Sequence, residues 1–206
     1  MTFTGRWLVI GLLVASCGLT NAASSGNAVE VTTLDGHPFY TDLTQVTSLR
    51  LHLRDGDFRI VRGDSDEIEI HTDGKNRALA SKMQVQLRRT GNSVDITFAH
   101  VPKNELQVTI AVPQQTNLFA RMRAGELSVD GVSGDKDLEL LAGDMYIQVP
   151  DASDYGPVDL SVRFGDVSGG QFGDPKGWIG NSLRRDGSGR YRLHAHVFAG
   201  DLTLKP

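Results

Sequence analysis

Five glycine–acid pairs stand in the same apolar register along this chain, and this repeat constrains the fold more than any other feature. The pairs are Gly56-Asp57, Gly125-Glu126, Gly143-Asp144, Gly165-Asp166 and Gly200-Asp201. The residues three positions before and two positions after each glycine are apolar in every copy. Because side chains alternate faces along a strand, these two positions would face opposite ways on a straight strand. We therefore predict a corner at each pair, where glycine is suited because it reaches positive φ freely.

Around these corners the sequence predicts an all-β fold. Period-two alternation of apolar and polar residues marks several half-buried strands, namely Val46–Ile60, Glu67–His71, Met83–Arg88, Val94–Phe98 and Leu106–Val112. No segment shows a sustained helical period. Repeated strand–corner–strand units complete one another's core by stacking. We predict a single domain over residues 30–206, with the glycine-rich stretch Gly169–Arg190 as an excursion from the repeat.

The N-terminus has the pattern of an export signal. Arg6 precedes an uncharged apolar stretch, Trp7–Ala15, which is too short to span a bilayer because spanning takes about 20 residues. The stretch ends in Val14-Ala15-Ser16-Cys17, which resembles the lipobox of bacterial lipoproteins. Cys17 is the only cysteine, so it has no disulfide partner within the chain.

These features predict a lipoprotein-type signal peptide over residues 1–16, lipidation at Cys17 and a flexible tether over residues 17–29. The residue after the anchor is Gly18 rather than aspartate, which resembles lipoproteins sent on to the outer membrane. The alternative is ordinary cleavage after Ala22 or Ala23, which would give a soluble periplasmic or secreted protein.

Two stretches carry a family resemblance, from Leu106 to Val149 and from Arg184 to Leu204. A strand ending in a proline break, then strand–Gly-Asp–strand units with short glycine loops, resembles a bacterial family of unknown function known as "putative adhesin". The resemblance spans about residues 46–204. It implies a single right-handed, toastrack-like β-solenoid in the cell envelope, in some members alongside envelope-stress sensing. Phe164 and Gly169 depart from the pattern, which predicts one thinly packed repeat unit.

Composition and motifs argue against several function classes. The chain has 25 acidic and 21 basic residues, giving a net charge of −4, and no basic patch suggests nucleic-acid binding. No Gly-x-Ser-x-Gly, His-Glu-x-x-His or phosphate-binding glycine motif is present in the sequence. We therefore predict no catalytic residue, no cofactor-binding residue and no cofactor.

The corner acids are the first candidates for a chemical site. In stacked units they would lie in register about 4.8 Å apart, a spacing open to a glycosidase carboxylate pair or to calcium. Recurrence in every copy favours a structural role, in which each acid accepts backbone N–H bonds at its turn. These acids are Asp57, Glu126, Asp144, Asp166 and Asp201.

The outward-facing histidines are the second candidates. His194 and His196 lie six and four residues before Gly200. His52 lies four residues before Gly56, the same offset as His196. A zinc site needs three or four ligands, and no cysteine or third histidine lies near the pair in sequence. We predict ordinary surface histidines and no metal site.

Arginines and two aromatic residues complete the candidates. Four arginines flank the corners and could form a cationic stripe for anionic glycans or lipids. We favour the alternative, in which they form ion pairs with Asp55, Asp57 and their neighbours. Phe172 and Trp178 lie on the glycine-rich excursion and could bind sugars or a partner protein. We favour a structural role, in which they cover an open end of the stack. The arginines are Arg54, Arg121, Arg123 and Arg163.

Together these features predict a non-enzymatic envelope lipoprotein that acts as a scaffold or adhesin-like interaction module, with envelope proteins or glycans as partners. Two alternatives stay open. One is a carbohydrate-active β-helix enzyme that uses the corner acids, and the other is a periplasmic sensor that binds a ligand.

Overall fold

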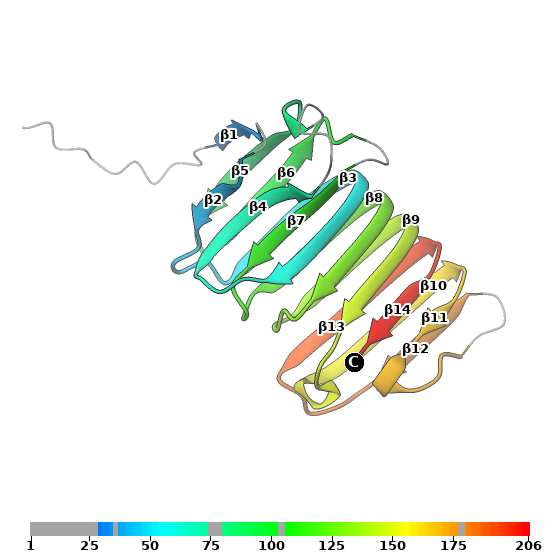
Figure 1. Cartoon of the computed structure of the whole chain (residues 1–206). Helices are drawn as coiled ribbons and strands as arrows, with labels where there is room; N and C mark the ends of the chain where they lie inside the picture. The colour runs from blue at the N-terminus through cyan, green and yellow to red at the C-terminus, as the bar shows by residue number, and fades with distance from the viewer. Residues whose placement is uncertain (1–28, 35–36, 74–79, 103–105, 177–179) are drawn as a thin grey trace, which may run out of the picture.

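The computed structural model describes residues 29–34, 37–73, 80–102, 106–176 and 180–206 (Figure 1). The fold is all-β, as predicted, with two short 3-10 helices, η1 (Ala152–Asp154) and η2 (Gly170–Phe172). The strands are β1 (Val29–Thr33), β2 (Phe39–Asp42), β3 (Ser48–Arg62), β4 (Glu67–Asp73), β5 (Gln84–Thr90), β6 (Ser93–Ala99), β7 (Gln107–Val112), β8 (Asn117–Asp130), β9 (Lys136–Gln148), β10 (Tyr155–Phe164), β11 (Val167–Ser168), β12 (Asn181–Arg185), β13 (Tyr191–Ala199) and β14 (Leu202–Lys205).

All these strands belong to one mixed sheet that does not close on itself. Its longest path runs β1-β5-β6-β3-β8-β9-β13-β10-β12, and Figure 1 shows the central strands of this path side by side. From β6 to β10 the neighbours are parallel, whereas β1, β5 and β12 pair antiparallel at the two ends.

Each central unit bends at its corner glycine, which divides it into a first arm before the corner and a second arm after it. Strands β3, β8 and β9 run through their corners, whereas the corners at Gly200 and Gly165 separate β13 from β14 and β10 from β11. The apolar positions on both sides of all five corners are buried in one core. The predicted corners are therefore confirmed: each bend turns both arms towards the same interior.

The corner glycines stack directly on one another in the order Gly56, Gly125, Gly143, Gly200 and Gly165, and we call this stack the glycine column. Their φ angles lie between +120° and +135°, a region that favours glycine. A Cβ atom on any of the last four would lie 1.9 to 2.0 Å from the carbonyl oxygen of the preceding glycine. No other residue fits, because the space of the side chain is occupied by the neighbouring backbone.

The strand order departs from the chain order at the far end of the sheet. Strand β13 lies between β9 and β10, pairing parallel with both, and β14 likewise lies between β9 and β11. A regular solenoid would place each unit beside the one that precedes it in sequence. The structure shows instead a mixed sheet whose last unit is inserted inside the stack.

The unit predicted to be thinly packed is filled by the excursion. Gly169 is buried, and a Cβ atom on it would lie 2.3 Å from the carbonyl oxygen of Gly173 and 2.5 Å from the Leu183 side chain. Phe172 and Leu183 are themselves only 8% and 6% exposed. The excursion therefore closes over this end of the core, and the expectation of a packing defect is wrong.

One charged side chain lies inside the core. Lys136 is 0% exposed and pairs in register with Leu118 and Leu193 of the adjacent strands. Its Nζ donates hydrogen bonds to Tyr155 Oη and, at 3.3 Å, to the Gly134 carbonyl oxygen. Burial lowers the pKa of Lys136 to about 8, against the opposing attraction of Asp135 and Asp154.

Replacing a glycine of the column tests the close backbone stacking. We expect Gly143→Ala to lower the free energy of unfolding by about 4 kcal/mol or more, because its Cβ would lie 1.9 Å from a carbonyl oxygen. Gly91→Ala is the matched control: it also has positive φ, at +57°, but no atom within 4 Å of the added Cβ, and should cost about 1 kcal/mol. Urea unfolding measures both values.

An intermediate loss is expected for Gly56→Ala, at the end of the column, where the added Cβ would lie 3.0 Å from the Val101 side chain rather than against backbone. Equal losses for the three variants would show that positive φ alone, and not stacking, requires glycine at the corners.

Replacing the buried lysine tests its charge. Folding shifts the pKa of Lys136 from 10.5 down to about 8. Below pH 8 the lysine is charged in both states and its burial lowers the free energy of unfolding. Between these two pKa values the unfolded chain binds more protons than the folded protein. The free energy of unfolding of the wild type should therefore rise from pH 8 to pH 10, by up to about 3 kcal/mol. Lys136→Met should be more stable at pH 7 and lack this rise.

The control is Lys82→Met, since Lys82 is exposed, and it should keep the wild-type pH dependence. Denaturant unfolding at pH 7, 8, 9 and 10 gives the comparison. A destabilised Lys136→Met protein, or one with the same pH dependence as the wild type, would contradict the assigned cost of the buried charge.

Candidate functional site

The outer face of the first arms carries side chains in regular rows across neighbouring strands. The row six residues before the corner glycines contains Asp137 on β9, His194 on β13 and Asp159 on β10. The row four residues before them contains Arg121 on β8, Glu139 on β9, His196 on β13 and Ser161 on β10. Stacking of the corners sets this register, so residues with the same offset meet.

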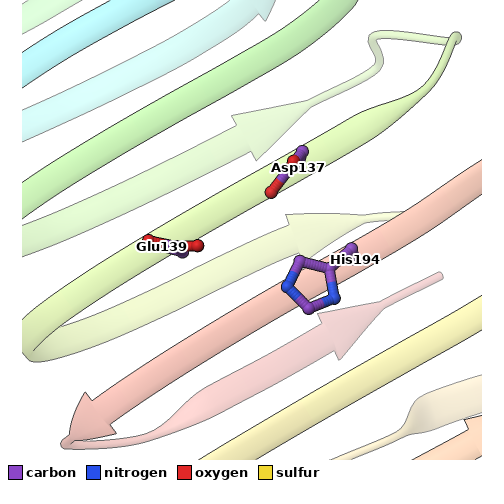
Figure 2. Close-up of side chains that lie close together, drawn as sticks. All are labelled: Asp137, Glu139 and His194. Carbon is purple, nitrogen blue, oxygen red and sulfur yellow. The ribbon is translucent and has the colours of Figure 1, made fainter.

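Asp137, Glu139 and His194 come together in these rows (Figure 2). A ring nitrogen of His194 and one carboxylate oxygen from each acid lie within 4.8 Å of one another, and all three side chains are half-buried. Within the described part of the chain, no hydrogen bond or ion pair joins His194 to either acid. The donor set of one imidazole and two carboxylates is one that divalent transition metals accept.

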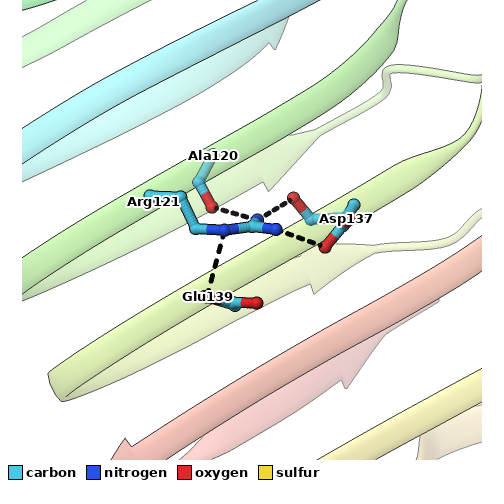
Figure 3. Close-up of polar contacts among 4 residues, drawn as sticks. All are labelled: Ala120, Arg121, Asp137 and Glu139. Carbon is cyan, nitrogen blue, oxygen red and sulfur yellow. Dashed lines mark hydrogen bonds and ion pairs between the residues drawn. The ribbon is translucent and has the colours of Figure 1, made fainter.

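Arg121 holds both carboxylates from the neighbouring strand β8 (Figure 3). Its Nη2 donates to Asp137 Oδ1 at 3.0 Å, and its Nε lies 3.0 Å from Glu139 Oε2. Its Nη1 donates to the backbone carbonyl oxygens of Asp137 and Ala120, at 2.9 and 3.1 Å. The guanidinium fixes the two acids and leaves one net negative charge on the three ionised groups.

The other predicted histidines are not part of this cluster, although His196 pairs in register with Glu139. His196 is hydrogen-bonded to Ser161, with 2.9 Å between Nδ1 and Oγ. His52 lies 3.6 Å from Asp95 and is separated from His196 by β8 and β9. The acids of β9 were not predicted as partners of His194, because only cysteine and histidine were considered as its co-ligands. The signal was present, because Asp137 stands six residues before Gly143, as His194 does before Gly200.

A pocket of about 320 Å³ opens beside the cluster, lined by Asp137 and His194 together with residues of β10, β12 and β13. Asp159 and Arg184 form an ion pair across it, with 2.6 Å between Oδ2 and Nη2. Arg192 also lines the pocket. The pocket therefore carries charges of both signs next to apolar residues such as Val158 and Leu193.

The corner acids act as links between neighbouring corners. Asp144 Oδ1 accepts a hydrogen bond from the backbone N–H of Asp201 at 3.1 Å, and Asp201 Oδ1 accepts one from the N–H of Asp166 at 2.9 Å. Asp166 Oδ1 accepts in turn from Asn181 Nδ2 at 2.9 Å. The predicted structural role is confirmed for these acids, although the bonds join successive corners rather than cap each turn.

The predicted ion pairing of the corner arginines is confirmed in part. Arg123 forms a two-pronged ion pair with Asp55, in which Nε donates to Oδ1 at 2.7 Å and Nη2 donates to Oδ2. Arg121 pairs with the acids of β9 as described. In the described ranges, Arg54 and Arg163 have no carboxylate partner, and the Arg163 guanidinium lies 6.0 Å from the Phe164 ring centroid.

A patch of exposed apolar residues lies next to these arginines, near the corners of β9, β13 and β10. We call it the aromatic patch: Leu141, Phe164 and Phe198, which are 53%, 55% and 44% exposed. The rings of Phe164 and Phe198 meet edge to face with centroids 5.4 Å apart. Leu141 and Phe198 stand two residues before their corner glycines, where Arg54, Arg123 and Arg163 stand in other copies. The sequence prediction noted those arginines and missed this patch.

The three remaining predicted positions have different outcomes. Phe172 is buried at the end of the stack, with the Arg185 guanidinium 5.7 Å from its ring centroid, which supports the covering role. Trp178 and Cys17 lie outside the described residues. Among the described residues, no helix has the length and apolar character needed to cross a membrane.

Comparison with known sequences finds no matching protein-family profile and no matching curated protein. Comparison with solved structures finds distant similarities. A crystal structure of a putative cell adhesion protein from Clostridium sporogenes is 10% identical with a TM-score of 0.49, covering 87% of this chain and 99% of the other.

Two further crystal structures show the same kind of distant similarity. A putative adhesin from Bacteroides fragilis gives 8% identity and a TM-score of 0.25 over 88% and 98% of the two chains. A putative adhesin from Parabacteroides merdae gives 11% identity and a TM-score of 0.22, covering 89% of this chain and 98% of the other.

Proposed function

We propose that this protein is a non-enzymatic interaction module of the bacterial cell envelope, a scaffold or adhesin-like protein that docks a partner protein on its aromatic patch. The observation that carries the proposal is the exposure of Leu141, Phe164 and Phe198 as one group on adjacent strands. Contiguous exposed apolar side chains rimmed by polar residues mark interaction sites in soluble domains.

The surroundings of the patch indicate the chemistry of the partner. Arg123 and Arg163 stand in the same row as Leu141 and Phe198, one on each side of them. Arg163 has no carboxylate partner within the described residues, so its charge is available to a ligand. Aromatic residues and arginine dominate the energy of protein interfaces. We infer a partner with an apolar surface that is bordered by acidic side chains.

The glycine column supports this function by fixing the patch on a rigid sheet. A surface that is already ordered loses little conformational entropy when a partner binds. We propose further that the parallel strands at the centre of the sheet form a right-handed, toastrack-like β-solenoid into which the last unit is inserted. Its extended faces suit the binding of macromolecules.

The envelope location belongs to the same proposal and rests on the sequence of the N-terminus. Lipid at Cys17 would anchor the chain, and Gly18 rather than aspartate after the anchor favours the outer membrane. Residues 17–29 would hold the domain at 30–206 away from the bilayer. Participation in envelope-stress sensing is the extension that the family resemblance suggests.

Intact mass spectrometry of the membrane fraction from an expressing Gram-negative host tests the anchor. We expect a mature chain that begins at Cys17 and carries the added mass of diacylglycerol and an acyl chain. Cys17→Ala should lose this mass and leave the membrane fraction. A wild-type chain that begins at Ala23 or Ser24 without lipid would contradict the anchor and indicate a soluble exported protein.

Photocrosslinking in the bacterium that makes this protein tests the docking surface. With p-benzoylphenylalanine in place of Phe198, we expect one discrete adduct with an envelope protein, and Phe164→Ser in the same chain should reduce its yield at least about fivefold. The matched control carries the crosslinker in place of Val31, which is 55% exposed on the edge strand β1 at the other end of the sheet. Absence of an adduct at position 198, or the same adducts at both positions, would contradict the proposal.

A further inference from the structure

We propose that Asp137, Glu139 and His194 form a binding site for a divalent transition-metal ion of the Zn²⁺ class. The site lies on the outer face of the first arms, where β13 is inserted beside β9. It is distinct from the aromatic patch, which lies next to the corners of the same strands.

The spacing of the three side chains fits an ion that bridges them. Their nearest donor atoms lie within 4.8 Å of one another, yet no direct hydrogen bond or ion pair joins His194 to either acid in the described part of the chain. Ligand atoms around one Zn²⁺, each about 2.1 Å from the metal, lie about 3.4 Å apart in a tetrahedral site. Small rotations of half-buried side chains close this difference.

The donor set favours a transition metal over calcium or magnesium. An imidazole nitrogen binds Zn²⁺, Ni²⁺ and Cu²⁺ well, whereas Ca²⁺ and Mg²⁺ require six or more oxygen ligands. Three protein ligands with an open fourth position are typical of zinc sites that bind exchangeable ligands.

Arg121 positions the acids without using all their oxygens. It contacts Oδ1 of Asp137 and Oε2 of Glu139, which leaves Oδ2 and Oε1 for the ion. Hydrogen bonds to the ligating carboxylates orient them and are a regular feature of metal sites. The same guanidinium places a positive charge near the ion, so the affinity should be moderate rather than that of a structural zinc site.

The cluster adjoins the pocket described above. Asp137 and His194 line this pocket together with Arg184 and Arg192. An ion held there would present its free coordination position next to cationic side chains, a combination that suits a carboxylate group of a ligand or partner.

Calorimetric titration of the full-length mature protein with Zn²⁺ tests the site, and Co²⁺ titration adds a visible-absorption readout of the coordination geometry. We expect one ion per chain with a Kd below about 100 µM, weakened at least about tenfold by His194→Ala and by Glu139→Gln. His196→Ala is the matched control, because His196 lies on the same strand, in register with Glu139, but its ring is hydrogen-bonded to Ser161 and does not belong to the group of three donors. It should change the affinity by less than about twofold.

Thermal unfolding of each variant verifies that the β domain stays folded before the titration is interpreted. Lack of saturable Zn²⁺ binding by the wild type would overturn the proposal. So would equal effects of His194→Ala and His196→Ala, or retention of full affinity by both His194→Ala and Glu139→Gln. These outcomes do not depend on whether a partner protein binds the aromatic patch.

Discussion

The close approach of backbone to backbone along the glycine column is the constraint on which the rest of this structure depends. At four of its glycines, the position of a Cβ atom is taken by the carbonyl oxygen of the preceding glycine in the column. This contact sets the register of every central strand to the same offset from its glycine. The carboxylates of Asp144 and Asp201 then link neighbouring corners through backbone N–H groups, so that the bends form one continuous edge of the molecule.

Both proposed sites arise from one topological feature, the insertion of β13 between β9 and β10. The insertion places His194 opposite Asp137 and brings Phe198 between Leu141 and the β10 residues Arg163 and Phe164. With the strands in chain order, β10 would separate β9 from β13, so that His194 would not reach Asp137 and Phe198 would not lie beside Leu141. The function proposed for the protein therefore depends on a tertiary arrangement as much as on the residues themselves.

Most of the fold could be predicted from the sequence, but less of the two proposed sites. The offset of apolar residues from each Gly-acid pair was sufficient to predict the corners, because the period-two pattern breaks only there. It could not predict the position of β13, since units with the same register pair equally well with either neighbour. The partners of His194 were missed for this reason. Lys136 was not predicted to be buried, because it occupies a core position that holds leucine in two neighbouring units. Its Nζ is satisfied there by the Gly134 carbonyl oxygen and by Tyr155, which comes from elsewhere in the chain.

The strand order is tested most directly by the position of β13 in solution, measured by nuclear Overhauser contacts between backbone protons of the isotope-labelled protein. We expect contacts from His196 and Val197 to Glu139 and Leu140 of β9 on one side and to Ser161 and Val162 of β10 on the other. Direct backbone contacts between β9 and β10, with β13 in contact with β10 alone, would contradict this strand order. They would remove the basis of the metal site and separate Leu141 from Phe198 in the aromatic patch.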